Sequence, residues 1–205
     1  MRNLTRNGRL ALRSALLAAA AAAAIGAVGC GTTSKNDTGQ APSPNAPEVN
    51  PAGDIPDNQA FVAFSPSGGG VAVKVPEGWS RTTSAGATTF TDKLNAVRIE
   101  TMPASAPPTV RDARQTEVPK LASSVAGFAS AKVDAVTRTA GKAVRITYLA
   151  SAKPNEVTGK AGTDAVERYV FFHNGRDLVL TLSGPKGADN VDPWRIITDS
   201  VRWSR

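Results

Sequence analysis

The sequence predicts an α+β domain, an antiparallel β-sheet covered by two main helices, and three observations indicate it. Runs of β-forming residues precede a helical stretch near the middle of the chain, and a second series of such runs precedes a helical stretch at its end. An order of strands, helix, strands, helix is typical of α+β domains. Asn174-Gly175 lies between two of these runs, and Asn-Gly in that setting is the strongest short-range signal for an antiparallel hairpin.

Four strands are predicted before the first helix, at residues 61–64, 71–75, 87–91 and 96–102. Pro76-Glu77-Gly78 is a predicted turn that leads into Trp79. We expect Gly78 to adopt a positive φ in this turn, because glycine has no Cβ to clash there. The last two of these strands form a predicted hairpin around Asp92-Lys93.

The first helix is predicted at residues 109–126. Thr109 is placed to cap its N-terminus, with Asp112 at the third helical position. Pro119 lacks a backbone N–H, so we expect it to kink or split the helix. Apolar side chains recur on roughly one face of this helix, at Val110, Ala113, Val118, Leu121 and Val125.

Four more strands follow, at residues 128–138, 143–150, 165–173 and 176–183, with a polar loop at 151–164. The last helix is predicted to begin at Asp192-Pro193, with Asp192 as its cap and Pro193 as its first residue. Trp194, Ile197 and Val201 recur at helical spacing after it. We expect these three side chains to face the core.

The N-terminus has the pattern of an export signal. Residues 1–13 contain four arginines and no acidic residue, and residues 15–28 contain no charged residue. This apolar run is shorter than the ~20 residues of a stable transmembrane helix. Ala27, Val28 and Gly29 then precede Cys30, the sole cysteine. The arrangement resembles the lipobox of bacterial lipoproteins, which implies cleavage before Cys30 and lipidation of its thiol.

We therefore predict three parts: a lipoprotein signal peptide at 1–29, the lipidated Cys30 with a disordered, proline-rich tether at 30–59, and a single α+β domain at 60–205. Residues 31–59 contain five prolines and no aromatic residue, a composition that cannot offset the entropy of ordering. Two acyl chains give stable anchoring. The predicted location is the extracytoplasmic face of the cell membrane.

The predicted domain resembles the PsbP-like fold, named for an extrinsic subunit of photosystem II and shared with small actinobacterial lipoproteins. The resemblance rests on Val75-Pro76-Glu77-Gly78-Trp79, which is similar to the family's entry turn, and on the terminal helix at 193–203. It implies a binding or assembly subunit rather than an enzyme. The photosystem cofactor contacts do not carry over, because no residue of this chain aligns with them.

The formal net charge of +7 falls to +3 from Cys30 onward, because four basic residues and no acidic residue precede it. There is no Lys/Arg-rich run, so we expect no nucleic-acid binding. Lys153, Lys160, Arg168 and Arg176 belong to one pair of predicted hairpins and are expected to share one side of the sheet, as a candidate binding surface. The alternative is that these charges only keep the domain soluble.

No residues show the pattern of a catalytic site. The serines and threonines lie in no Gly-x-Ser-x-Gly or Ser-x-x-Lys sequence. His173, the only histidine, lies beside a predicted turn and has no neighbour in the sequence that would make it a base or a metal ligand. A sole cysteine excludes a disulfide within the chain and a thiolate metal cluster. We predict no enzyme, no metal and no cofactor.

The predicted function is that of a membrane-anchored extracytoplasmic lipoprotein acting as a non-enzymatic binding or assembly module in the cell envelope. Its predicted partners are the membrane, through lipid on Cys30, and an envelope protein or an apolar ligand, and we expect a monomer. Two alternatives stay open: an envelope hydrolase whose site forms only in the fold, and a small solute-binding accessory protein of a transporter. An acidic residue with a shifted pKa in a pocket beside His173 would favour the hydrolase.

Overall fold

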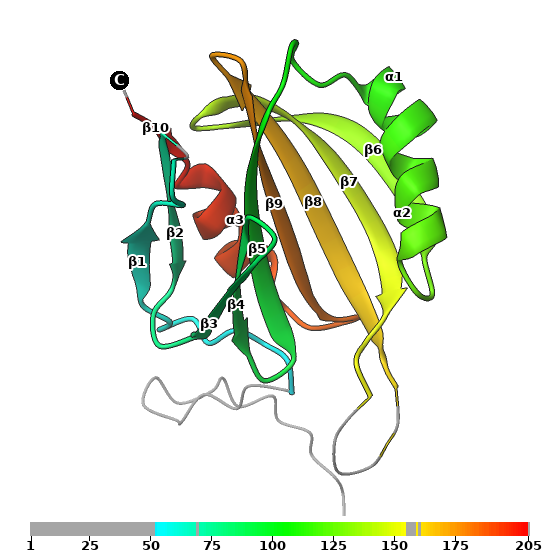
Figure 1. Cartoon of the computed structure of the whole chain (residues 1–205). Helices are drawn as coiled ribbons and strands as arrows, with labels where there is room; N and C mark the ends of the chain where they lie inside the picture. The colour runs from blue at the N-terminus through cyan, green and yellow to red at the C-terminus, as the bar shows by residue number, and fades with distance from the viewer. Residues whose placement is uncertain (1–51, 69, 155–158, 160, 205) are drawn as a thin grey trace, which may run out of the picture. The chain divides into compact units, whose positions relative to one another are not determined.

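The computed structural model describes residues 52–68, 70–154, 159 and 161–204. Their main element is an antiparallel sheet of seven strands in the order β3-β4-β5-β9-β8-β7-β6 (Figure 1). The strands are β3 Ser80–Ser84, β4 Ala87–Asp92, β5 Asn95–Pro103, β6 Ala129–Arg138, β7 Gly141–Ser151, β8 Thr163–His173 and β9 Arg176–Pro185. Sheet and helices together confirm the predicted α+β class.

A second, smaller sheet has the order β1-β2-β10 and is also antiparallel. Its strands are β1 Phe61–Phe64, β2 Val71–Pro76 and β10 Arg202–Trp203. β10 therefore lies beside β2, a strand that precedes it by more than a hundred residues in the sequence. β3 has no apolar alternation in the sequence, because it is polar and exposed throughout. β10 corrects the predicted terminal helix at 193–203, since that helix ends at Asp199 and residues 202–203 form a short strand.

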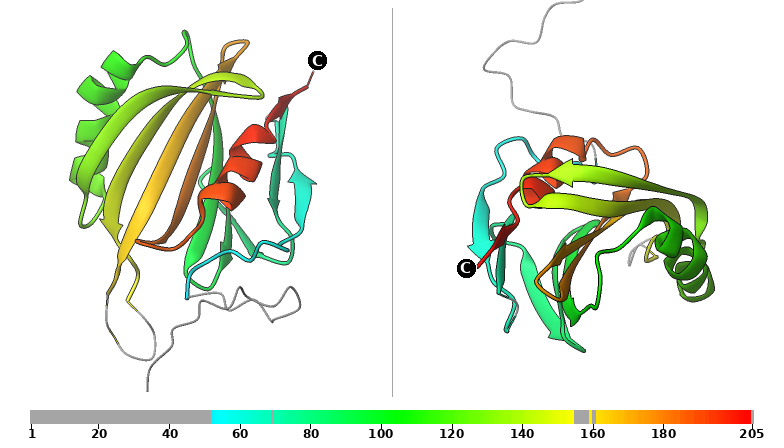
Figure 2. Two further views of the ribbon diagram at one scale, coloured as in Figure 1. Left: turned by 180° about the vertical axis from the view of Figure 1, so that it is seen from behind. Right: turned by 90° about the horizontal axis from the view of Figure 1, so that it is seen from above.

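Two helical regions cover the main sheet. The first, the α1–α2 helix (residues 110–124), comprises α1 Val110–Asp112, a π-helical segment Ala113–Glu117 and α2 Val118–Ser124. The second is α3, Val191–Asp199. Figure 2 shows α3 and the small sheet on one side of the curved main sheet and the α1–α2 helix on the other.

The alternation of side chains along the central strands builds a separate apolar core on each face of the sheet. Leu178, Leu180 and Leu182 of β9 are fully buried against α3 and the small sheet, in what we call the first core. The second core lies under the α1–α2 helix and includes Ile146 and Val166. Both faces of the main sheet are therefore covered, as the predicted pattern of strands and helices requires.

The predicted turns are present where the sequence places them. Asn174 and Gly175 connect β8 to β9 with φ values of 47° and 76°. Positive φ at both central residues is the conformation that Asn-Gly adopts in a tight hairpin. Gly78 also has a positive φ, 81°, as predicted for the turn before Trp79.

The start of the last helix differs from the prediction. The N-cap of α3 is Asn190, not Asp192, which lies in the first turn. Asn190 forms no side-chain cap hydrogen bond. Its side-chain amide instead donates to Gly53 and to Asn95, and its side-chain oxygen accepts from the backbone of Ile55. The side chain at the cap is thus used to hold distant segments together.

The folded region begins before residue 60. Ile55 was predicted to lie in the tether, yet only 3% of its surface is exposed and it belongs to the first core. Gly53 is in contact range of Pro185, where a Cβ would approach the proline ring to 2.4 Å. The prediction was wrong for residues 52–59, because one buried isoleucine and backbone hydrogen bonds order a segment whose composition alone looks like a linker.

Candidate functional site

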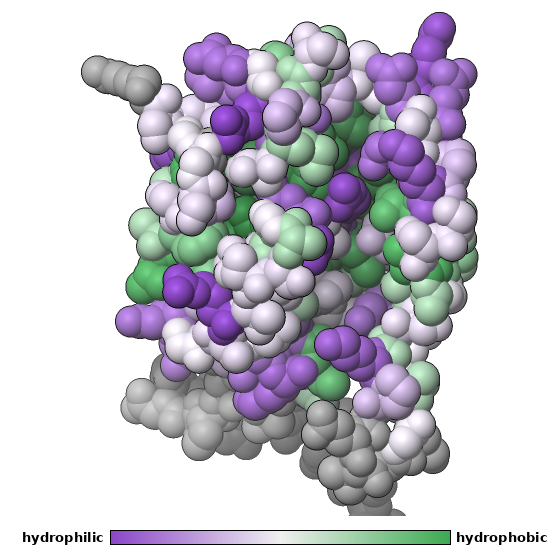
Figure 3. Space-filling model, viewed as in Figure 1, coloured by the Kyte–Doolittle hydropathy of each residue, from purple (hydrophilic) through white to green (hydrophobic). Residues whose placement is uncertain are grey.

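A cavity of about 240 Å³ lies between the α1–α2 helix and the main sheet. Figure 3, which has the view of Figure 1, shows a recess in the surface between β5 and this helix, where hydrophobic and hydrophilic side chains lie next to each other. The lining residues come from the helix, from the loop before it and from four strands: Met102, Pro108, Thr109, Asp112, Ala113, Thr116, Glu117, Val144, Arg168, Val170, Asp177 and Val179.

The floor of the cavity is apolar. Val144, Val170 and Val179 are buried and come from the neighbouring strands β7, β8 and β9. They face the α1–α2 helix because side chains of a strand alternate between the two faces, so the residues between them belong to the first core. Ala113 is the buried helix residue above them. Its small side chain leaves the space that a larger residue would fill.

Arg168 supplies the positive charge of the cavity wall. Its side chain is 15% exposed and lies 3.6 Å from the carboxylate of Glu100 and 4.0 Å from that of Glu117. Its Nη1 also donates a hydrogen bond of 3.0 Å to Thr181, whereas its buried Nε has no partner among the described residues. The guanidinium is therefore shared among groups of the sheet and the helix.

Glu100 is held ionised by two arginines. Burial alone would raise its pKa, but the hydrogen bond and charge of Arg98, followed by the charge of Arg168, outweigh burial and lower the pKa below its ordinary value. Arg98 Nη2 lies 2.9 Å from the Glu100 carboxylate. The positive charge on this side of the cavity is thus balanced within the protein.

Asp177 is the cavity's uncompensated acid. Its Oδ1 is buried and has no hydrogen-bond partner among the described residues. Burial, followed by the negative charge of Glu117, raises the pKa of Asp177 above its ordinary value. Two carboxyl groups of the same cavity wall therefore repel each other, and a positive group placed between them would relieve that repulsion.

The π-helical segment positions the helix side of the cavity. The backbone N–H of Val118 donates to the carbonyl of Ala113, five residues earlier, which is the spacing of a π turn. Pro119 follows at once, so the helix is interrupted where it was predicted to kink or split. Thr116 and Glu117 line the cavity from this wide turn. Single π turns within α-helices occur frequently at functional sites.

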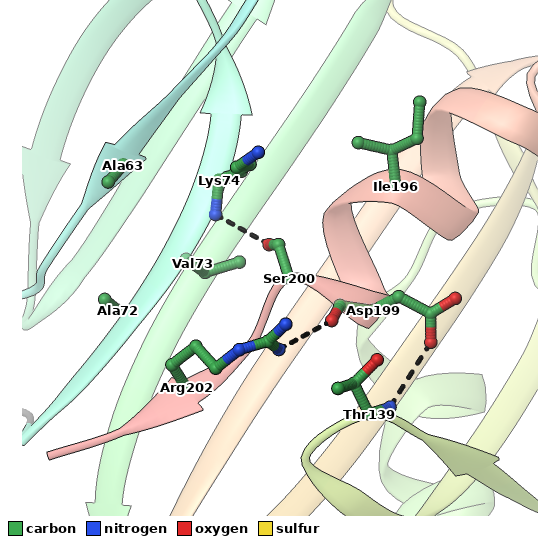
Figure 4. A pocket seen from close by; sticks show the side chains of 9 residues that line it. All are labelled: Ala63, Ala72, Val73, Lys74, Thr139, Ile196, Asp199, Ser200 and Arg202. Atoms are coloured by element: carbon green, nitrogen blue, oxygen red, sulfur yellow. Dashed lines mark hydrogen bonds between the residues drawn. The ribbon is translucent and has the colours of Figure 1, made fainter.

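A second cavity, of about 430 Å³, lies between β2, the end of α3 and β10 (Figure 4). The backbone N–H of Lys74 donates to Ser200 Oγ at 2.7 Å, and Arg202 Nη1 donates to the carbonyl of Asp199 at 2.9 Å. The Asp199 carboxylate accepts a 3.4 Å hydrogen bond from the backbone of Thr139. These contacts join the small sheet, α3 and the β6–β7 turn. The polar groups that line this cavity therefore hold these three elements together.

The three predicted basic residues that the structure describes, Lys153, Arg168 and Arg176, do not share one surface. Lys153 follows the end of β7 and is exposed, whereas Arg176 begins β9 at the opposite end of β8. Arg168 is mostly buried in the cavity wall, and Lys160 lies outside the described residues. Of the three that are described, Arg168 alone lines the candidate site, as part of a charged network under the helix.

His173 does not line the cavity that contains Asp177. Its ring stacks on Trp203 at 5.1 Å between centroids, beside the small sheet. The arrangement that would have favoured a hydrolase, a shifted acidic residue in a pocket beside His173, is therefore not the one found.

Glu117 and Asp177 were not identified from the sequence. Asp177 carries a usable signal, because it occupies a position in β9 whose alternate neighbours Val179 and Thr181 face the helix. An acidic residue in the same phase as Val179 and Thr181 points to a polar site under the helix. Glu117 carries no comparable signal, since its orientation depends on the π turn.

Cys30 and the predicted signal peptide lie outside the described residues. Among the residues that the structure does describe, no helix is long and apolar enough to cross a membrane. Within the same residues, no group of three or more histidine, cysteine or acidic side chains could hold a metal ion.

No protein-family model matches this sequence, and no curated protein matches it significantly. Solved structures with a similar arrangement include a cyanobacterial PsbP (CyanoP) from Synechocystis sp. PCC 6803, with 15% identity and a TM-score of 0.47. That alignment covers 74% of this chain and 98% of CyanoP. The PsbP-like fold suspected from the sequence is thus found among these structures.

LpqN of Mycobacterium tuberculosis, described as involved in cell envelope biogenesis, is 16% identical over 73% of this chain and 87% of its own, with a TM-score of 0.38. A protein from Bacteroides thetaiotaomicron is 12% identical over 67% of this chain, with a TM-score of 0.43. This chain spans 47% of the length of that protein. At such identities the likeness concerns the fold alone.

Proposed function

We propose that this chain is a membrane-anchored extracytoplasmic lipoprotein whose folded domain is a non-enzymatic binding module of the cell envelope. The observation that carries the binding role is the cavity under the α1–α2 helix. Small-molecule sites are concave and mainly apolar, with a few polar groups that fix the orientation of the ligand. The valine floor, with Arg168, Glu117 and Asp177 at the walls, has this composition.

The anchoring part of the proposal rests on the sequence. A basic start, an uncharged apolar run and small residues before the sole cysteine are together typical of a lipoprotein precursor. Lipid on Cys30 would keep the domain at the membrane surface as a monomer, with the cavity open to molecules of the envelope.

Lipidation is tested by labelling cells with radioactive palmitate. Wild-type protein should incorporate the label and partition into detergent, and Cys30→Ser should remain as unlabelled, uncut precursor. A matched control is Ser34→Ala, which changes a nearby residue and leaves the lipobox intact. Equal labelling of Cys30→Ser and wild type would remove the anchor from the proposal.

The binding role is tested separately by native mass spectrometry of the lipoprotein released gently from its membrane. We expect a non-covalent small molecule on wild type and its loss from Thr116→Phe, because Thr116 is an exposed helix residue that lines the cavity. Phenylalanine there would fill the opening. If Thr116→Phe carries the same bound mass as wild type, the small molecule binds outside this cavity.

A further inference from the structure

The geometry of the cavity under the α1–α2 helix points to the chemical class of its ligand: we propose that it binds a small organic monoamine whose ammonium lies between Asp177 and Glu117 and whose apolar body covers the valine floor. This inference rests on the proposed binding role of the same cavity and adds the selection for a cation.

The first step is the charge of the walls. Asp112, Glu117 and Asp177 are the acidic lining residues, and Arg168 is the basic one. The guanidinium of Arg168 is already shared between Glu100, at 3.6 Å, and Glu117, at 4.0 Å, and it donates to Thr181. No ion pair is found for Asp177 among the described residues. Asp177 therefore brings to the cavity a negative charge that no ion pair balances in the described part of the chain, whereas Glu117 is also paired with Lys120 at 3.3 Å.

The second step is the state of Asp177. Its Oδ1 is withdrawn from water and has no hydrogen-bond partner in the described part of the chain. A buried polar group without a partner is costly, and a carboxylate more so than a neutral group. An ammonium in the cavity offers the positive charge and the hydrogen-bond donors that this carboxyl lacks.

The third step is size and polarity. About 240 Å³ corresponds to the liquid volume of roughly eight water molecules. This admits a short alkyl or aryl amine and is too small for a lipid with two acyl chains. Val144, Val170 and Val179 form the apolar surface against which such a body would lose its contact with water.

A neutral alcohol and a carboxylate of the same length are the matched competitors. An alcohol would bury the same apolar area without supplying a charge. A carboxylate would meet Glu117 and Asp177 as a third negative charge and would be repelled. An alkylamine, like the lysine side chain, is protonated at neutral pH and is the member of the series that the walls favour.

The probes are hexylamine, hexan-1-ol and hexanoate, titrated calorimetrically into the full-length lipoprotein in a non-ionic detergent. We expect hexylamine to bind wild type about tenfold more tightly than hexan-1-ol, as one hydrogen bond to a charged group provides. Hexanoate should bind most weakly. Asp177→Asn should abolish the preference of the site for hexylamine over hexan-1-ol.

Glu117→Gln should reduce the preference less, because Glu117 is also paired with Lys120. The matched control is Asp189→Asn, an exposed acidic residue outside the cavity, which should retain the full preference. Thr116→Phe should weaken the binding of both hexylamine and hexan-1-ol. Thr116 is exposed on the helix, so this variant tests the site without disturbing a buried residue.

Equal affinity of hexylamine and hexan-1-ol, or a preference that survives Asp177→Asn, would overturn the selection for amines and leave the binding role intact. Failure of all three probes to bind wild type, or binding that Thr116→Phe does not change, would overturn the proposed function of this cavity together with the selection.

Discussion

Asn190 shows how a single polar residue can organise segments that are far apart in the sequence. It is 3% exposed, its Oδ1 accepts the backbone N–H of Ile55 at 2.8 Å, and its Nδ2 donates to Gly53 and to Asn95, each at 3.0 Å. Gly184 leaves the room, since a Cβ there would come within 2.3 Å of Asn95. The sequence could not reveal this network, because Asn190 lies 95 to 137 residues from its three partners.

Asn190→Ala should destabilise the domain by about 3 kcal/mol, because it leaves the Ile55 N–H and the Asn95 Oδ1 buried without partners. Urea unfolding monitored by tryptophan fluorescence measures the change. Ser105→Ala, at an exposed loop residue, is the control and should stay within about 0.5 kcal/mol of wild type. Similar midpoints for Asn190→Ala and the control would show that the network contributes little.

Asp177 should make the stability depend on pH in an unusual direction. Because burial and Glu117 raise the pKa of Asp177, its proton is bound more tightly in the folded than in the unfolded protein. Deprotonation therefore costs stability at pH values above the folded-state pKa, and the cost disappears as the pH falls through that pKa to the ordinary aspartate value.

Asp177→Asn should thus be more stable than wild type at pH 7, and the difference should shrink toward about pH 4. Urea midpoints at several pH values test this, with Asp189→Asn as the control that should show no such trend. A difference between Asp177→Asn and wild type that is constant with pH would contradict it.

At the scale of elements, local signals predicted the α1–α2 helix well and its internal geometry poorly. Thr109 is its N-cap, as predicted, and Thr109 Oγ1 accepts the backbone N–H of Asp112 at 3.1 Å. The π-helical segment was not predicted beyond an expected break at Pro119. The missing N–H of a proline can be read from the sequence, whereas the choice of a π turn over a kink depends on packing against the sheet.

Thr109→Ala should lower stability by about 1 kcal/mol through loss of this cap. The same substitution should also weaken the binding of any ligand in the cavity, because Thr109 and Asp112 both line the cavity. Thr109→Ser, which keeps the hydroxyl, is the matched control and should recover most of the stability. Equal losses in thermal unfolding for the alanine and serine variants would assign the effect to the methyl group instead.

For the molecule as a whole, hairpin pairing was predictable and long-range pairing was not. The neighbours β4-β5, β6-β7 and β8-β9 follow from turns such as Asn174-Gly175. The pairing of β5 with β9 joins segments some eighty residues apart and has no local signal. The cavity shares this property, since its walls combine β5, β7, β8, β9 and the helix, so its charges could be assembled only in the fold.

The N-terminal boundary of the domain also depends on contacts between segments far apart in the sequence, and truncation tests it. A fragment of residues 60–205 lacks Ile55 and Gly53, so it loses one buried isoleucine, the acceptor of Asn95 Nδ2 and the donor to Asn190 Oδ1, while the hydrogen bond between Asn190 and Asn95 remains. We expect it to be about 4 kcal/mol less stable than residues 47–205 in urea unfolding, from lost apolar burial and unpaired polar groups. Ile55→Ala in the longer fragment separates the two contributions, because it removes the apolar burial and keeps the backbone hydrogen bonds. Equal midpoints for the two fragments would return the boundary to residue 60.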